Sequence, residues 1–113
     1  IIAKYPCGID IESTKRDATQ IKHKFLNDDD FTSGKSNKKL IQNWCSKEVL
    51  FKINGRKDIH FKEHLTIKKN GEFFSGYCEH PEIKFNSTIK VLNFESYCLA
   101  FNTNYREEVN VIV

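Results

Sequence analysis

The sequence predicts an α+β domain in which one α-helix packs on an antiparallel β-sheet, and three observations lead to this fold class. Apolar residues recur with helical spacing near the N-terminus, short segments rich in Val, Ile, Phe and Tyr fill most of the remaining chain, and Asn-Gly pairs separate some of those segments. A chain of 113 residues is long enough for one domain with a modest core. We therefore expect a single two-layer domain over residues 1–113.

The first third of the chain predicts a small hairpin followed by the only helix. Residues 3–7 and 9–11 alternate roughly between apolar and polar side chains around Gly8, as two short paired strands do. A hydroxyl residue at position 13 or 14 can cap a helix, which we predict over residues 14–27, followed by a polar loop over residues 31–37. The apolar residues that share one face of this helix are Ala18, Ile21, Phe25 and Leu26.

Beyond residue 40 the pattern is typical of antiparallel strands joined by tight turns. One predicted hairpin joins residues 49–53 to residues 59–61 through Asn54-Gly55, and a second joins residues 65–68 to residues 73–78 through Asn70-Gly71. Further strands are predicted at residues 83–85, 89–94, 97–101 and 109–113. A helix ahead of such a meander buries its apolar face on one side of the sheet, so we expect Trp44 and most of the nine Phe residues in the core.

Four cysteines in a chain of this size predict two disulfides and an oxidising compartment. The residues alone leave three pairings open, and the absence of any CxxC pair argues against a zinc knuckle, so no metal or other cofactor is expected. The chain lacks Met and begins Ile1-Ile2, as a mature form does after signal-peptide removal. No apolar run approaches the roughly 18 residues that span a bilayer. We therefore expect a secreted protein without a membrane segment.

The charge is only mildly basic, with a net charge of +3 and a pI near 8.7. Nucleic-acid binding is the default interpretation only for much denser clusters of Lys and Arg. Function on a fixed scaffold concentrates in loops, so we expect a recognition surface in the loop over residues 28–39 and in the turn after residue 54. Its candidate residues are Asp28, Asp29, Asp30, Lys35, Lys38, Lys39, Arg56 and Lys57.

The densest group of chemically reactive side chains runs from His60 to His64. In a strand over residues 59–67, His60, Lys62 and His64 face one way and Glu63 faces the other, so an acid and a base do not converge and we predict no catalytic residue. A carboxylate on another strand, such as Glu72 or Glu95, could restore such a site. The same residues match the H-x-x-E-H zinc motif, but that motif needs a helix, since a strand separates the two histidines by about 13 Å.

Asn86-Ser87-Thr88 forms an N-glycosylation sequon at a predicted turn. Because the chain is expected to be secreted, a glycan on Asn86 is compatible with this prediction.

The Tyr5-x-Cys7 sequence, the single early helix, the β-rich remainder and the late Cys98 together make the chain similar to the RNase-like secreted effectors of powdery-mildew fungi. That family has a fold like the small fungal guanyl-specific ribonucleases, and its early and late cysteines are paired. The resemblance implies a bond between Cys7 and Cys98, which would leave Cys45 to pair with Cys78. This second bridge is not part of the family's minimal pattern.

The resemblance also implies a function. Such effectors are secreted avirulence or virulence proteins that act in the host cytoplasm, and many are pseudoenzymes that lack the catalytic set of the ribonucleases. The implied partners are a host protein, including a plant intracellular nucleotide-binding leucine-rich-repeat (NLR) immune receptor, and as a second class RNA. We expect a monomer. Two alternatives remain open: an active secreted ribonuclease that cleaves single-stranded RNA, and an unrelated cystine-stapled extracellular inhibitor or toxin.

Overall fold

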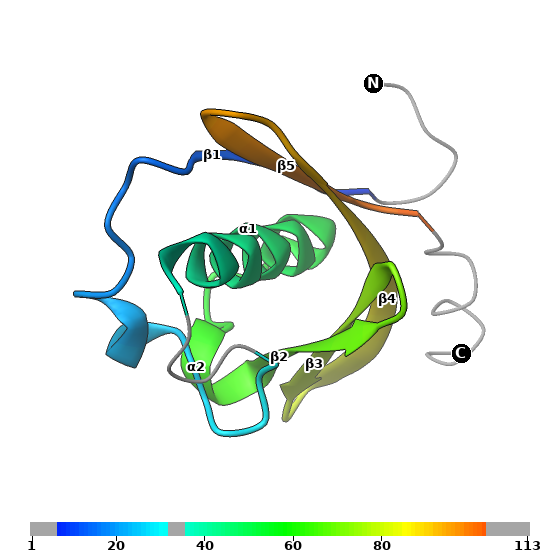
Figure 1. The fold of residues 1–113 in the computed structure, drawn as a ribbon. Coiled ribbons are helices and arrows are strands. Elements are labelled where there is room, and N and C mark those ends of the chain that lie inside the picture. The colour runs from blue at the N-terminus through cyan, green and yellow to red at the C-terminus, as the bar shows by residue number, and fades with distance from the viewer. Residues whose placement is uncertain (1–6, 32–35, 104–113) are drawn as a thin grey trace.

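The computed structural model describes residues 7–31 and 36–103, and it confirms the α+β class (Figure 1). A five-stranded antiparallel sheet curves around one side of a long helix, and the irregular segment between the first strand and that helix lies on another side. The elements follow the chain in this order: β1 (Ile9–Ser13), η1 (Lys22–Lys24), α1 (Asn37–Asn54), α2 (Phe61–His64), β2 (Leu65–Asn70), β3 (Phe73–His80), β4 (Ile83–Asn93) and β5 (Tyr97–Asn102).

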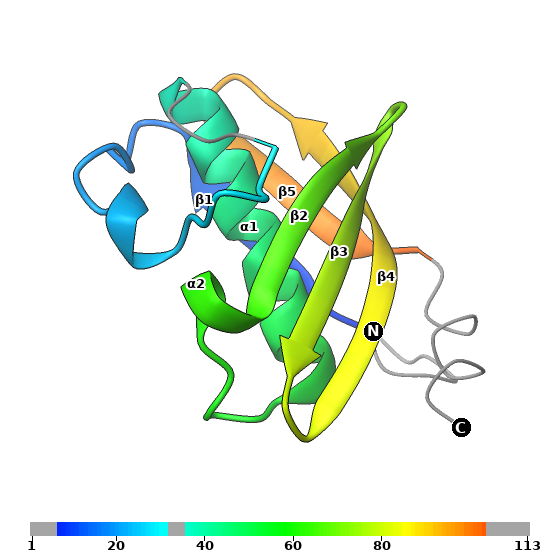
Figure 2. The ribbon, with the colours of Figure 1, turned by 90° about the horizontal axis from the view of Figure 1, so that it is seen from below.

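The sheet has the strand order β1-β5-β4-β3-β2, so β2 to β5 form the predicted meander and β1 joins at the β5 edge (Figure 2). The predicted turn at Asn70-Gly71 is confirmed, and Gly71 takes the left-handed conformation with a φ of 64°. The predicted strands at residues 83–85 and 89–94 are one continuous strand, β4. The turn predicted at Asn86 is therefore wrong, because this residue pairs with Tyr77 in the middle of the sheet.

Strand β1 contains the predicted residues 9–11, but its partner differs from the prediction. Ile9 lies opposite Phe101 and Ser13 lies opposite Tyr97, so β1 pairs with the last described strand rather than with the residues before Gly8. Residues 3–6, including Tyr5, and the predicted strand at 109–113 lie outside the described residues.

The largest correction concerns the helix. The predicted helix over residues 14–27 is wrong, since that segment holds only the three-residue η1. The long helix is α1, which covers the predicted strand at residues 49–53. Its first turn is capped by the Ser36 hydroxyl, and its last turn ends at Gly55, which has a φ of 78° and donates its N–H to Phe51 O at 2.8 Å. Asn54-Gly55 therefore ends a helix instead of turning a hairpin.

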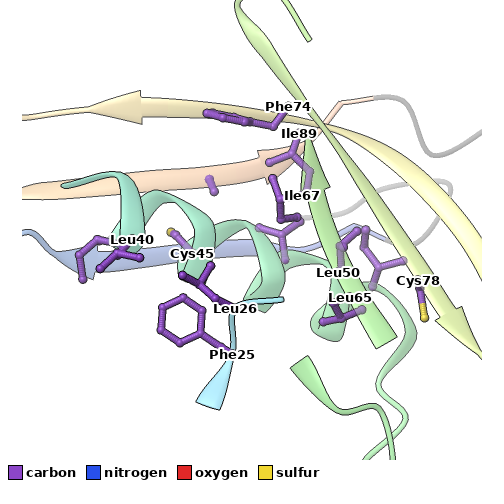
Figure 3. Packing of buried hydrophobic residues seen from close by; sticks show 14 of the residues in the cluster. Phe25, Leu26, Leu40, Cys45, Leu50, Leu65, Ile67, Phe74, Cys78 and Ile89 are labelled. Atoms are coloured by element: carbon purple, nitrogen blue, oxygen red, sulfur yellow. The ribbon is translucent and has the colours of Figure 1, made fainter. Parts of the chain in front are cut away.

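Helix α1 is hard to recognise in the sequence because it is buried around most of its circumference. Polar side chains at Asn43, Ser46 and Lys47 are fully buried, so the apolar residues do not form the single stripe of a surface helix. The sheet contributes Leu65, Ile67, Phe74 and Ile89 to the core, and Phe25 and Leu26 close it from another side (Figure 3). Trp44 is half-buried between Phe25 and Phe61, at ring-centroid distances of 5.2 and 5.0 Å.

The segment that was expected to be helical is fixed by side chains from elsewhere in the chain. The Asn37 side chain accepts from Ala18 N at 2.7 Å and donates to Arg16 O at 2.8 Å. Ala18 and Phe25 then pack into the core as anchors of an irregular segment. The apolar spacing that predicts a helix here thus reflects contacts with α1 rather than helical periodicity.

One buried ion pair joins this segment to α1 and the sheet. Lys47 Nζ lies 2.7 Å from Asp30 Oδ2, and both side chains are completely buried. Asp30 also accepts from Ile67 N at 2.8 Å and Asn27 N at 2.9 Å, and Lys47 also donates to the carbonyls of Phe25 and Phe61. Burial lowers the pKa of the Lys47 ammonium, and Asp30 offsets part of this decrease. Asp30 is therefore a structural residue, and its prediction as part of a recognition surface is wrong.

The predicted disulfides are not formed, and all four thiols are free. Cys98 lies opposite Glu12 in the sheet. Glu12 is five residues after Cys7, a separation of about 16 Å along an extended chain. Cys98 and Cys78 lie opposite Asn93 and Phe85, about 26 Å apart along β4. Cys45 contacts Cys98, so it is remote from Cys78 as well. Because a disulfide needs Cα atoms within about 7 Å, neither the Cys7–Cys98 nor the Cys45–Cys78 bond fits this fold.

No helix in the described part of the chain is both long enough and apolar enough to cross a bilayer.

Candidate functional site

The predicted recognition residues do not meet on one surface. Asp28 and Asp29 are exposed in the loop before α1, and Lys38 and Lys39 are exposed on its first turn. Arg56 and Lys57 follow its last turn, and 18 helical residues place the two ends of α1 about 27 Å apart. Lys35 lies outside the described residues. The candidate surface therefore divides into separate patches.

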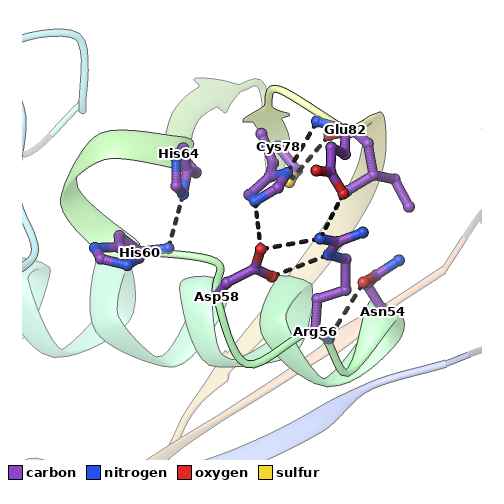
Figure 4. Close-up of polar contacts among 9 residues, drawn as sticks. Asn54, Arg56, Asp58, His60, His64, Cys78 and Glu82 are labelled. Atoms are coloured by element: carbon purple, nitrogen blue, oxygen red, sulfur yellow. Dashed lines mark hydrogen bonds and ion pairs between the residues drawn. The ribbon is translucent and has the colours of Figure 1, made fainter.

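The predicted strand at residues 59–61 is wrong, because the histidine-rich segment forms the short helix α2 (Figure 4). His64 Nδ1 accepts from His60 N at 2.8 Å, and the two rings lie 5.4 Å apart between centroids. The His80 ring lies 4.8 Å from that of His64. His60 and His64 are therefore in contact and not about 13 Å apart, as the predicted strand required. Even so, no cluster of three or more His, Cys, Asp or Glu suited to a metal is found in the parts of the chain described here.

The Arg56 guanidinium, which follows α1, binds two carboxylates of the protein itself. Its Nε and Nη2 each lie 2.9 Å from an oxygen of Asp58, and Nη2 also lies 2.9 Å from Glu82 Oε1. The guanidinium holds the pKa of Asp58 well below its ordinary value, and the same contacts raise the pKa of Arg56. The cluster joins the end of α1 to the β3–β4 turn, so Arg56 is not a free cation for a phosphate group.

His80 uses both of its ring nitrogens inside the protein. Nε2 lies 3.0 Å from Asp58 Oδ2, and Nδ1 accepts from Glu82 N at 3.0 Å. Its side chain is 7% exposed. Proton transfer in RNA cleavage requires an imidazole nitrogen within hydrogen-bond reach of the substrate. The Asp58–His80 pair therefore holds the turn in place and lacks the free nitrogen of a catalytic dyad.

The face of the sheet that points away from α1 carries an open pocket of about 470 Å³. Thr66 and Lys68 of β2 and Tyr77 and Glu79 of β3 reach it because alternate residues of a strand share one face. Asp29 lies at its rim, where its N–H donates to Asn27 Oδ1 at 2.9 Å. None of the five lining residues is a histidine. The prediction from sequence missed this pocket, although the alternation of Thr66 and Lys68 with buried residues is visible in the sequence.

The same outer face is apolar towards β1. Ile9 and Ile11 are 44% and 60% exposed and lie opposite Phe101 and Leu99 of β5. Phe94 and Tyr97 stack at the β4–β5 turn with ring centroids 4.6 Å apart. We call the following set the apolar outer surface: Ile9, Ile11, Phe94, Tyr97, Leu99 and Phe101. Exposed apolar surface of this kind commonly marks an interaction site.

Few cations lie on the outer face of the sheet. Lys84 is 4.0 Å from Glu79, and Lys90 lies over the Phe73 ring at 6.0 Å. Lys68 shares the pocket with the two carboxylates of Asp29 and Glu79. This face is therefore mixed in charge and is unlike the positive groove that follows a nucleic-acid backbone.

The inner face of β1 carries two carboxyl groups that the sequence prediction also missed. Asp10 and Glu12 both point towards α1, where Lys52 Nζ lies 2.9 Å from Asp10 Oδ1 and Trp44 Nε1 donates to Glu12 Oε2 at 3.3 Å. Burial and the neighbouring Asp10 raise the pKa of Glu12 to about 7. The Glu12 carboxyl therefore titrates near neutral pH.

No family model, curated protein or solved structure matches the chain. The resemblance to the RNase-like effectors therefore rests on Tyr5-x-Cys7, the β-rich remainder and the late Cys98, because the early helix and the Cys7–Cys98 bond are not formed.

Proposed function

We propose that the chain is a non-catalytic binding protein that contacts a protein partner through the outer face of its sheet. The observation that carries this proposal is the composition of that face, where the apolar outer surface lies on the same side of the sheet as the polar pocket. Protein interfaces commonly combine an apolar centre that contains aromatic residues with a polar rim. Tyr97, Phe94 and Phe101 supply aromatic groups of this kind.

The charge of this face favours a protein over RNA as its ligand. RNA binding needs cations that are free to contact phosphates, together with exposed aromatic rings on which bases stack. Lys84 lies beside Glu79, and the pocket around Lys68 contains two carboxylates. The aromatic rings thus lie on a face without a strong positive field.

The placement of the histidines supports a non-catalytic function. The pocket is lined by two carboxylates, a threonine, a lysine and a tyrosine. The three neighbouring imidazoles belong to His60 just before α2, His64 on α2 and His80 at the end of β3. Of these, His80 has no free ring nitrogen. An acid and a base that flank one phosphate are therefore not assembled in the pocket.

The resemblance to the powdery-mildew effectors gives this proposal a biological setting. On that basis we propose a ribonuclease-like scaffold without catalysis, secreted by a fungus, whose partner is a host protein. A plant NLR immune receptor is the class of host protein that would detect it.

RNA hydrolysis separates this proposal from the ribonuclease alternative. The purified protein is incubated with single-stranded RNA beside a His60→Ala/His64→Ala variant and a Glu63→Gln variant, which control for contamination. We expect no cleavage above the background that all three share. Cleavage to a cyclic phosphate that is lost in either variant would overturn the non-catalytic assignment.

A photo-crosslinking amino acid tests the surface itself. It is placed at Ile11 on the apolar outer surface or, as a matched control, at Lys39 on the first turn of α1, and each protein is expressed in plant cells. We expect a defined protein adduct from position 11 that is absent from position 39 and is lost when Ile9→Lys is added. Equal adducts from both positions, or adducts with RNA alone, would contradict the proposed surface.

A further inference from the structure

Cys45 and Cys98 meet in the core, although they are 53 residues apart in the sequence. Both are fully buried, Cys45 on α1 and Cys98 on β5. Cys45 Sγ lies 3.9 Å from Cys98 O and 3.2 Å from Asp10 O of the adjacent strand β1. Each of the two side chains also shifts the pKa of the other. The α1 thiol is thus held against the inner face of β5, beside the Cys98 side chain.

We propose that Cys45 and Cys98 form a disulfide when the protein folds in the presence of a low-molecular-weight disulfide such as oxidised glutathione. Strand register excludes the other partners for Cys98, because it places Cys7 about 16 Å and Cys78 about 26 Å from Cys98 along their strands. Cys45, by contrast, is buried with Cys98 and contacts its backbone.

The exchange takes two steps. The thiolate of one cysteine attacks one sulfur of glutathione disulfide and releases one glutathione thiolate. The other cysteine then loses its proton and attacks the protein sulfur of this mixed disulfide, which releases the second glutathione. Two protein thiols and one glutathione disulfide thus give one protein disulfide and two glutathione molecules. In the folded protein, interaction with Cys45 lowers the pKa of Cys98, whereas interaction with Cys98 and burial raise the pKa of Cys45.

The reaction can take place only when glutathione disulfide reaches the two sulfurs. Both sulfurs are buried in the folded protein, so the exchange occurs during folding or on transient opening of β1 and β5 over α1. The bond would tie α1 to the strand that lies between β1 and β4. Cys7 would remain as an exposed free thiol and Cys78 as a buried one.

Peptide mapping tests the proposal directly, because trypsin places each cysteine in a different peptide. Cys45 lies in the peptide 40–47 and Cys98 in the peptide 91–106, whereas Cys7 and Cys78 lie in 5–15 and 70–84. The full chain is refolded in a glutathione redox buffer, alkylated without reduction, digested and analysed by mass spectrometry. We expect a crosslinked species of peptides 40–47 and 91–106, with Cys7 and Cys78 alkylated after denaturation. A Cys7–Cys98 or Cys45–Cys78 crosslink, or four alkylated cysteines, overturns the proposal.

Two variants give an independent measurement. A Cys7→Ser/Cys78→Ser protein keeps the proposed pair, so reduction should lower its thermal midpoint by at least about 10 °C, as it should in the parent protein. In a Cys45→Ser protein the midpoint should no longer respond to reduction. A reduction-sensitive midpoint in Cys45→Ser, or an insensitive one in the double variant, would place the bond elsewhere.

Discussion

The Lys47–Asp30 pair and the Arg56–Asp58–Glu82 cluster contain the same kinds of charged group in opposite surroundings. Lys47 and Asp30 are completely buried. They also bond to backbone groups of Phe25, Phe61 and Ile67. The side chains of Arg56, Asp58 and Glu82 are 35%, 55% and 70% exposed. An ion pair fixes a fold when its removal leaves a charge and several backbone groups buried without partners. An exposed ion pair contributes little, because water solvates both charges when the pair is broken.

The largest expected effect is at the buried pair. Asp30→Ala leaves the Lys47 ammonium buried without its counterion and the N–H of Ile67 without its acceptor, and this should lower the free energy of unfolding by about 3–5 kcal/mol. Chemical denaturation measures the loss. Asp29→Ala, at the exposed neighbouring position, is the matched control and should change it by less than about 0.5 kcal/mol. Similar losses in the two variants would show that the buried ion pair is not the cause of the effect.

Glu12 is less buried than the Lys47–Asp30 pair and less exposed than the Arg56 cluster, and its ionisation makes the free energy of unfolding depend on pH. The pKa of its carboxyl is about 7 in the folded protein and near 4.5 when unperturbed, so ionisation destabilises the fold as the pH rises from about 4.5 to 7. Glu12→Gln stays neutral and should remove this decrease. At pH 8 it should be more stable than the parent by about 1–2 kcal/mol, after allowance for screening by solvent.

Denaturation at pH 5 and pH 8 measures this difference. The two proteins should differ little at pH 5, where Glu12 is largely protonated. Glu95→Gln, at an exposed position in the β4–β5 turn, controls for the general effect of removing a carboxylate. A Glu12→Gln protein that keeps the pH dependence of the parent would show that another group causes it.

The smallest effect is expected at the exposed cluster. Arg56→Ala removes three hydrogen bonds to carboxylates that water can replace, so the change in stability should be small. Any loss of stability that Arg56→Ala causes at low ionic strength should disappear in 1 M NaCl, where the Debye length is about 3 Å. Thermal denaturation of both proteins at low and high salt measures this. A large loss that is insensitive to salt would mean that Arg56 supports the fold as Lys47 does.

The sequence predicts the sheet better than the helix, and particular residues explain why. Strands β2 to β5 follow local rules, since buried and outward residues alternate and Asn70-Gly71 needs only a tight turn. Helix α1 depends on distant partners, because Lys47 is buried only with Asp30 and the irregular segment beside it. Asn54-Gly55 shows the same limit, since the left-handed glycine of a hairpin turn also ends a helix.

The candidate site shows a similar division. The alternation of outward residues on β2 and β3 could have indicated the pocket, and Asp10 and Glu12 could have been recognised as strand neighbours on one face. The burial of Asp30 and the hydrogen bonds of His80 could not have been predicted, because each depends on a partner more than 15 residues away in the sequence. Local sequence patterns carry no information about such partners.

The loop that contains Asp30 also has a consequence for self-association. An edge strand offers unpaired backbone groups to other molecules and is a site of aggregation. On the β2 edge, Ile67 donates its N–H to Asp30 and its C=O accepts from Phe31 N at 3.0 Å. Leu65 O accepts from the Asn27 side chain at 3.0 Å. The loop thus takes the place of a sixth strand. Detaching it would turn a closed edge into a template for neighbouring chains, so Asp30 variants should form aggregates as well as unfold.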